Sequence, residues 1–226
     1  MLKILYEDKW LVVCIKPDGV LSEEFGRGKC MPELLKKQVK AYKIGVVHRL
    51  DKPVSGVMVF SKHRDATASL SKQIADRSFE KEYLCVCRGC PTNKTSEMRD
   101  YLFRDKAKNK TFVVKTLRKG VKEAFLTYET LQTITTGDGE LSLVKIKLGT
   151  GRTHQIRVQF ASRKMPILGD EKYGSKADCK LALFSHRLAF RHPAKKEIME
   201  FSEIPQNGYP WNKFDLSNFN VNTETL

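Results

Sequence analysis

Short apolar runs, divided by turn-forming residues, characterise the first half of the chain. Alternating or continuous apolar runs predict strands, whereas apolar residues spaced three or four apart predict helices. The expected strands cover residues 4–6, 11–15, 54–61 and 82–87, and the expected helices cover residues 31–42 and 65–77. Lys16-Pro17-Asp18-Gly19 predicts a turn after the second strand, because Pro and Gly interrupt regular structure.

The second half of the chain is richer in strand patterns. Strands are expected at residues 111–115, 124–133, 141–148, 181–190 and 197–204, with the polar segment 104–110 as an exposed hairpin tip. A Gly-rich loop beginning at Gly149 leads into a helix expected to end near Ser162. Thr153 is its expected N-cap, since a hydroxyl accepts from a free backbone N–H. The loop and the helix start suit a phosphate or a carboxylate.

These elements predict an α+β fold with a mixed, largely antiparallel β-sheet core and a few flanking helices. Residues 1–205 are expected to form a single domain, and the Asn- and Thr-rich residues 206–226 a partly disordered tail. The first residues lack the pattern of a signal peptide, and the apolar run at 10–15 is too short to span a bilayer. We expect a soluble, cytoplasmic protein.

Six cysteines are too few for a disulfide scaffold, so reduced thiols are expected. Cys85, Cys87 and Cys90 have a spacing that raises a metal site as one alternative. The other alternative is buried structural thiols, since Cys85 and Cys87 share one face of a strand and no nearby His completes a zinc set. We favour the structural reading and expect no metal.

The charge is the strongest compositional signal. Lys and Arg number 41 against 26 Asp and Glu, a net charge of +15. From Arg99 to Lys122 there are nine Lys or Arg against two Asp. A polyanionic partner explains such self-repulsion, and RNA or DNA fits better than a membrane because no basic amphipathic helix with an aromatic face is present in the pattern.

One carboxylate, Asp51, stands among basic residues at a predicted corner. The stretch His48-Arg49-Leu50-Asp51-Lys52-Pro53-Val54-Ser55-Gly56 leads into an apolar strand, and its Pro and Gly favour a rigid turn. Basic neighbours favour the ionised form, which suits a nucleophile or a charge stabiliser. The alternative is an Asp that caps the turn or pairs with Arg49.

A series of motifs follows a fixed order along residues 4 to 205. They are Tyr6-Glu7-Asp8, Lys16-Pro17-Asp18-Gly19, His48-Arg49-Leu50-Asp51 with Ser55-Gly56, Lys81-Glu82-Tyr83, residues 151–158, Gly169-Asp170 with Tyr173-Gly174, and His186 with Leu188, Phe190, His192 and Pro193. With these motifs in this order, the chain resembles the RluA-type pseudouridine synthases. Ordered motifs are more specific than any single tetrapeptide. The auxiliary N-terminal RNA-binding domain of many relatives is expected to be absent.

The resemblance implies a pseudouridine synthase-like catalytic domain that isomerises a uridine in rRNA or tRNA without a cofactor or a metal. It makes Asp51 the nucleophile, Arg157 its charge partner and Tyr83 the residue beside the base. It places His48 and Arg49 at the mouth of the site, against phosphates or the flipped nucleotide. Substrate contacts are also expected at the start of the predicted helix, at Arg152, Thr153 and His154. We expect a monomer without a protein partner.

Two rival functions remain open. A non-catalytic RNA-binding or ribosome-associated protein would need the charge but not Asp51, Tyr83 and Arg157 together. A hydrolase or phosphotransferase using Asp51 is less favoured, since the kinase-loop order and a nucleotide-binding Gly-rich loop with a strand Lys are missing from the pattern.

Overall fold

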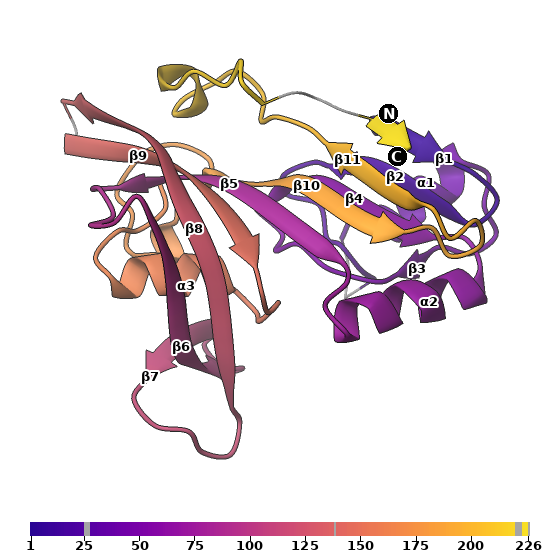
Figure 1. Ribbon diagram of the computed structural model, residues 1–226, viewed down its shortest axis with the longest axis horizontal. Helices are drawn as coiled ribbons and strands as arrows, with labels where there is room; N and C mark the ends of the chain where they lie inside the picture. Colours follow the sequence, from indigo (N-terminus) through magenta and orange to yellow (C-terminus); the bar gives the residue numbers. More distant parts are fainter. Residues whose placement is uncertain (25–27, 138, 220–222, 226) are drawn as a thin grey trace. The chain divides into compact units, whose positions relative to one another are not determined.

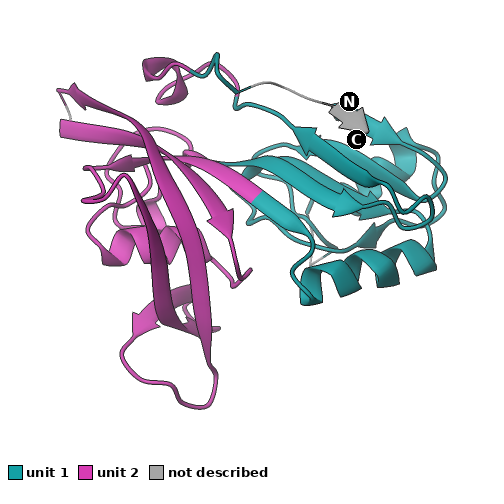
Figure 2. Cartoon of the chain, viewed as in Figure 1, with its two compact units in different colours: residues 1–81, 184–205, 216–226 teal, residues 82–183, 206–215 magenta. Residues whose placement is uncertain are grey.

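The structure is a computed structural model that describes residues 1–24, 28–137, 139–219 and 223–225. The chain divides into two compact units, coloured separately in Figure 2. Unit 1 comprises residues 1–81, 184–205 and 216–226, and unit 2 comprises residues 82–183 and 206–215. We describe each unit by itself.

Unit 1 is a mixed sheet with two helices (Figure 1). Its strands follow the order β1-β2-β4-β10, with β3 beside β4 and with β11 and β12 beyond β10. β10 runs parallel to β4, and the other pairs are antiparallel. The elements are β1 (Ile4–Glu7), β2 (Leu11–Lys16), α1 (Met31–Gln38), β3 (Gly45–Val46), β4 (Ser55–Ser61), α2 (Arg64–Ala75), β10 (Leu183–Arg191), β11 (Ile198–Ser202) and β12 (Thr223–Thr225).

The core of unit 1 lies between its sheet and α2. Alternate residues of β2 and β4 point into it, and Leu70 of α2 packs against them, as expected from the periods of strands and helices. Phe79 stacks on Phe190 of β10 with ring centroids 5.3 Å apart. Ala66 and Leu70 are the buried residues of α2, so one stripe of this helix faces the sheet.

Unit 2 is an antiparallel sheet in the order β5-β9-β8-β6-β7 (Figure 1). Its elements are β5 (Glu80–Arg88), β6 (Thr95–Asp105), β7 (Lys110–Val114), β8 (Val121–Thr136), β9 (Gly139–Leu148), α3 (Gln155–Ser162) and the 3-10 helices η1 (Glu171–Tyr173) and η2 (Trp211–Lys213). β6 and β7 form a hairpin in which Asp105 pairs with Lys110. The predicted tip at 104–110 is confirmed as this hairpin turn.

Helix α3 covers one face of the β6–β7–β8 ribbon. Val158 of α3 clusters with Leu102 of β6, Ala124 of β8 and Tyr173. The amide of Gln159 donates to Asp100 Oδ2 at 2.7 Å, which ties the helix to the same strand. We call this covered face the inner face of the ribbon.

The predicted fold class is confirmed, and the differences lie in details. The first predicted helix ends at Gln38 rather than Tyr42, because Lys40 takes a left-handed φ of 50°. β6 was not predicted as a separate strand: Met98 and Leu102 are its buried residues, and charged residues occupy much of the rest. Cys85 and Cys87 are buried, as predicted for structural thiols.

The segment predicted as a tail includes residues of both units. Asp215, in this segment, exchanges two hydrogen bonds with Gln132 of β8, at 2.6 and 3.0 Å. The prediction of partial disorder also falls on residues 220–222 and 226, which lie outside the described residues. Among the described residues, no helix is long and apolar enough to cross a membrane.

Candidate active site

Asp51 begins a tight turn that connects β3 to β4. The N–H of Val54 donates to the carbonyl of Asp51 at 3.0 Å, and the N–H of Gly19 donates to the carbonyl of Lys52 at 3.0 Å. Asp51 itself is half-buried, whereas Lys52 is exposed. The corner predicted from Pro53 and the following Gly is therefore present, and a second loop is bonded to it.

Lys16 holds this turn from inside unit 1. Its side chain is completely buried, and its Nζ donates to Pro17 O at 2.9 Å, Lys52 O at 3.0 Å and Val54 O at 2.7 Å. Burial lowers the pKa of Lys16 to about 8, although the charges of Asp18 and Asp51 act in the opposite direction. One ammonium group thus holds the backbone that follows Asp51 in sequence. It is also close enough for the charge of the Asp51 carboxylate to act on its pKa.

Ser22 bonds to the backbone that precedes Asp51 in sequence. Its hydroxyl donates to Leu50 O at 2.7 Å and accepts from Leu50 N at 3.0 Å. Downstream, Gly56 has a φ of 127°, and a Cβ there would lie 2.3 Å from Ser185 O. Only glycine lets β4 approach β10 this closely, so Asp51 stands in a backbone segment secured at both ends.

His48 lies in the interior of unit 1. It is 8% exposed, its Nε2 accepts from Val59 N at 3.2 Å, and its ring lies 5.6 Å from that of Phe79. Burial, reinforced by the charge of Lys81, lowers the pKa of His48 to about 3. His48, expected at the mouth of the site, is therefore a buried, neutral imidazole.

Arg49 is placed as expected on the surface. Its side chain is 54% exposed and forms an ion pair with Glu23. Because both partners face solvent, this pair is weak and exchangeable. Arg49 is thus available to a phosphate at little cost.

The second group of predicted residues lies at the start of α3 in unit 2. The prediction that Thr153 caps this helix is wrong. The cap position is held by His154, which has a left-handed φ of 54° and makes no side-chain cap hydrogen bond. Instead Gln155 reaches back, and its Oε1 accepts from the N–H of Arg152 at 3.0 Å and from Thr150 Oγ1 at 2.8 Å.

Arg157 projects from α3 into a buried ion pair. Its Nε and Nη2 each lie 2.7 Å from an oxygen of Asp170, and the two side chains are 6% and 0% exposed. Its guanidinium also lies 5.2 Å from the ring centroid of Tyr173. Two parallel charged hydrogen bonds fix the plane and direction of the guanidinium.

Tyr173 connects this ion pair to the loop ahead of α3. Its hydroxyl lies 2.9 Å from Nδ1 of His154, accepts from Thr111 N at 2.9 Å and donates to Thr111 O at 3.2 Å. The Thr111 hydroxyl in turn donates to Thr153 O at 2.9 Å. Burial raises the pKa of Tyr173, so the hydroxyl stays protonated at neutral pH.

The remaining predicted residues, Arg152 and Tyr83, both lie in unit 2. Arg152 donates from Nε to Glu123 O at 3.0 Å, so it orders the loop. Tyr83 is 5% exposed on β5, where it pairs with Ile146 of β9. Asp51 belongs to unit 1, and Tyr83 and Arg157 belong to unit 2. The pairing of Asp51 with Arg157 stays a prediction.

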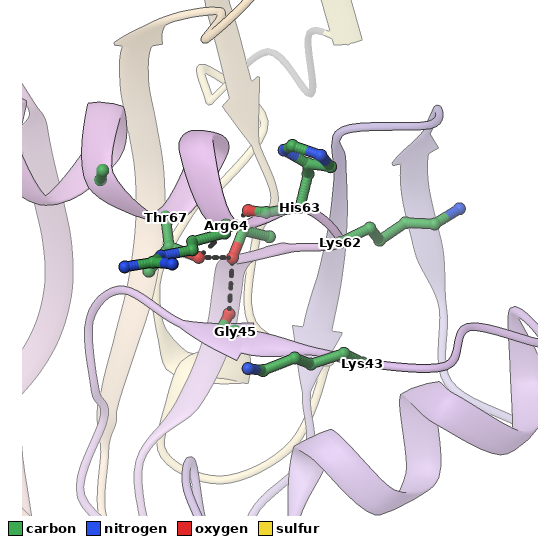
Figure 3. Close-up of a pocket in the computed structure, with 8 residues that line it drawn as sticks. Lys43, Gly45, Lys62, His63, Arg64 and Thr67 are labelled. Carbon is green, nitrogen blue, oxygen red and sulfur yellow. Dashed lines mark hydrogen bonds between the residues drawn. The ribbon is translucent and has the colours of Figure 1, made fainter.

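Unit 1 also has a basic pocket of about 380 Å³ at the start of α2 (Figure 3). Lys43, Lys62, His63 and Arg64 contribute to its lining. Ser61 Oγ and Thr67 Oγ1, both in this lining, lie 2.6 Å apart. The pocket adds to the positive surface of unit 1.

Lys16, Asp170 and Tyr173 were missed as site residues by the sequence analysis. Each belonged to a quoted motif but had no role assigned. A signal was present for Lys16, because it ends an apolar strand just before a Pro-Asp-Gly turn, where a charged side chain needs a specific partner. For Asp170 and Tyr173, sequence distance from α3 concealed the contact.

Comparison with known proteins agrees with this architecture. The sequence profile described as RNA pseudouridylate synthase matches residues 10–162. An uncharacterized RNA pseudouridine synthase of Aquifex aeolicus (strain VF5) is 34% identical over 93% of this chain and 72% of its own length. Ribosomal large subunit pseudouridine synthase D of Borreliella burgdorferi is 34% identical over 88% of this chain, which spans 64% of that protein.

Solved structures share the fold. Human RNA pseudouridylate synthase domain containing 4 has a TM-score of 0.74 at 24% identity, over 90% of this chain and 89% of that chain. Human RNA pseudouridylate synthase domain containing 1 has a TM-score of 0.77 at 21% identity, over 93% and 85%. Fold and sequence together define an RNA-modifying isomerase. The chain belongs to the RNA pseudouridylate synthase family.

Proposed function

We propose that this chain converts a uridine of ribosomal or transfer RNA to pseudouridine, with Asp51 as the nucleophile. The observation that carries the proposal is the support of the Asp51 turn. Lys16 and Ser22 bond to the backbone on either side of Asp51, which fixes the position of the backbone that carries this half-buried carboxylate. A turn cap does not require a buried lysine for its support, whereas a nucleophile gains from fixed geometry.

The chemistry is an isomerisation in which all atoms are retained. The N1–C1′ bond of the uridine breaks, a C5–C1′ bond forms, the proton at C5 is lost and N1 gains a proton. Asp51 provides the attacking carboxylate in this scheme: its bond to C1′ forms as the N1–C1′ bond breaks, and it breaks again as the C5–C1′ bond forms, which returns the free carboxylate. Arg157 keeps it ionised, and Tyr83 lies against the base and takes part in proton removal from C5.

The substrate is proposed to be RNA on grounds of charge and relationship. A net charge of +15 suits a phosphate backbone. Relatives named ribosomal large subunit pseudouridine synthases C and D favour ribosomal RNA over transfer RNA. Exposed Arg49, the loop at Arg152 and the hairpin tip at 104–110 are the proposed phosphate contacts, and the target nucleotide must leave its stack to be reached.

The alternative function is RNA binding without catalysis. Charge and fold suit it equally well, and only the chemistry separates the two. Comparing pseudouridine maps of total RNA from cells with and without this gene identifies the modified uridine. Unchanged maps, with RNA still bound, favour the binder.

Asp51→Asn tests the catalytic role. The amide keeps the size and most hydrogen bonds of the carboxylate but is not a nucleophile, so tritium release from RNA labelled at C5 of uridine should fall by several orders of magnitude. RNA affinity should persist or rise, because a negative charge is removed. The matched control is Asp65→Asn, at a carboxylate that is 80% exposed in the same unit. Wild-type release from folded Asp51→Asn would refute the proposal.

A further inference from the structure

The face of the β6–β7–β8 ribbon opposite α3, here called the outer face, has four aromatic residues. They are Tyr101 and Phe103 of β6, Phe112 of β7 and Phe125 of β8. Cross-strand register puts Phe103 opposite Phe112, and Arg99 opposite Phe125. Residues 99, 101 and 103 alternate with the buried Leu102 and with Asp100, which contacts α3, so they share the face that α3 does not cover.

Two of these rings are exposed to an extent unusual for sheet aromatics. Tyr101 is 37% exposed and Phe112 is 36% exposed. Leu117, in the loop that follows β7, is 64% exposed. Exposed aromatic side chains that share a sheet face indicate an interaction surface rather than a core.

Cations accompany the rings on this face. The Arg99 guanidinium lies 4.7 Å from the Phe125 centroid and Arg118 lies 5.7 Å from Phe103. At the edge of the ribbon, the Lys110 ammonium lies 5.8 Å from Phe112 and 5.1 Å from Tyr173. Aromatic rings interleaved with cations suit a single nucleic-acid strand, because its bases stack on the rings while its phosphates meet the positive charge.

Arg99 is held flat by its neighbours. Its Nε donates to Glu97 and its Nη1 to Glu123, each at 2.9 Å, and its side chain remains 51% exposed. Beneath it, the Phe125 ring lies against Gly149, where a Cβ would come within 1.9 Å of the ring. The guanidinium is therefore held by two carboxylates close to the Phe125 ring and remains half exposed, and guanidinium planes stack on bases.

We infer that the outer face is a stacking surface for unpaired bases of the RNA substrate, using Tyr101, Phe112 and the plane of Arg99. The inference rests on the proposed function and refines its substrate: RNA with single-stranded bases near the target uridine. Complementarity of charge supports this occupant, because residues 99–122 contain nine Lys or Arg against two Asp. The basic tip joins β6 to β7, so phosphates and bases of one strand meet adjoining parts of the same hairpin.

The test compares ring removal with charge removal in the full chain. Tyr101→Ser with Phe112→Ser should weaken binding of a short single-stranded oligouridine by about 10- to 100-fold, because each stacked base contributes about tenfold or more. The slope of log Kd against log salt should not change, since no charge is lost. Lys106→Ser, Lys108→Ser and Lys110→Ser together should instead reduce that slope.

Control variants separate stacking from folding. Tyr101→Phe with Phe112→Tyr keeps both rings and should bind as the wild type does. Tyr42→Ser removes a fully exposed ring from unit 1 and should also leave affinity unchanged. An RNA duplex of equal length should lose far less affinity on ring removal, because its bases are already stacked.

The outcomes distinguish this inference from the proposed function. Wild-type oligouridine affinity of the ring-removal variant, in protein that still forms pseudouridine, overturns the inference alone. A change in sedimentation without a change in RNA affinity would identify the face as a contact between copies of this chain and would also overturn it. Loss of pseudouridine formation in Asp51→Asn tests only the proposed function.

Discussion

The Asp51 turn of unit 1 and the start of α3 in unit 2 both position a charged side chain, but by different interactions. In unit 1 a buried cation, Lys16, bonds to neutral backbone carbonyls. In unit 2 a buried cation, Arg157, bonds to a buried carboxylate, Asp170. The first arrangement fixes backbone position, and the second fixes the direction of a side chain.

The free-energy cost of burying a charged side chain depends on the group that it bonds to. Carbonyl dipoles compensate a buried ammonium only in part, and the pKa of Lys16 falls to about 8 accordingly. A guanidinium fits a carboxylate through two parallel hydrogen bonds and is hard to deprotonate. Lys16 can therefore lose its proton near physiological pH. Arg157 stays charged, so its burial depends on the carboxylate of Asp170.

Breaking the ion pair of unit 2 should have the largest effect on stability. Asp170→Asn removes the charge of the carboxylate that holds the buried Arg157 through two hydrogen bonds, which costs about 3–5 kcal/mol. Denaturant unfolding measures the loss as a lower midpoint at an unchanged slope. The matched control is Glu123→Gln, which breaks an ion pair of Arg99 with both side chains half exposed and should lower the midpoint far less. Equal losses in the two variants would contradict the assigned role of Asp170.

Removing the ammonium of unit 1 should have a smaller effect on stability and a distinct effect on catalysis. Lys16→Met keeps the volume of the side chain but leaves buried carbonyls without their donor, at a cost of about 2–3 kcal/mol. Because a small shift of a reacting group lowers rates strongly, kcat should fall by about 10- to 100-fold with less change in KM. Tritium release and denaturant unfolding provide the two readouts. Normal kcat with reduced stability would reduce Lys16 to a purely structural role.

Lys16→Met should also change how the stability of the folded state depends on pH. The pKa of Lys16 is lower in the folded state, about 8, than in the unfolded chain, about 10.5. Between these values the unfolded chain binds more protons, so this group makes the folded state more stable as pH rises from 8 to 10.5. The Lys16→Met protein should lack that rise. If the stability of the variant rises with pH as that of the wild type does, the Lys16 charge is not buried as assigned.

Local patterns predicted most of the strands and the hairpin tip, because alternation and turn residues act within a few positions of the chain. They failed where long-range contacts decide the conformation. The side chain of Gln155, rather than that of Thr153, forms the hydrogen bonds to the loop ahead of α3. It also donates to Phe125 O, which lies 30 positions earlier in the sequence. The helix after Met31 ends early, at Gln38, because Lys40 has a left-handed backbone for which the sequence carries no signal.

The candidate site shows the same division. Asp51 and the turn around it followed from Pro, Gly and charge within one short stretch. The interior position of His48 did not, because it depends on Phe79 and Val59, which are distant in sequence. The Arg157–Asp170 pair spans 13 positions and was likewise hidden, although both residues stood in quoted motifs.

His48 provides the smallest of these effects and the last test of the comparison. Its pKa is about 3 in the folded state against 6.5 for an ordinary histidine, so the unfolded chain binds a proton that the folded chain rejects as pH falls below 6.5. The stability that depends on neutral His48 is complete above pH 6.5 and is lost at up to about 1.4 kcal/mol per unit below it. From pH 7 to pH 5 the loss should reach about 2 kcal/mol.

His48→Gln isolates that contribution, since its amide oxygen can still accept from Val59 N but the side chain does not titrate. The variant should unfold at a lower denaturant midpoint at pH 7, yet its midpoint should decline less than that of the wild type between pH 7 and pH 5. Exchange of the Val59 amide proton should accelerate in the wild type over the same range, because a protonated Nε2 cannot accept its hydrogen bond. Parallel pH profiles for the two proteins would mean that His48 is not buried in its neutral form. The acid sensitivity of unit 1 would then have to come from groups other than the His48 imidazole.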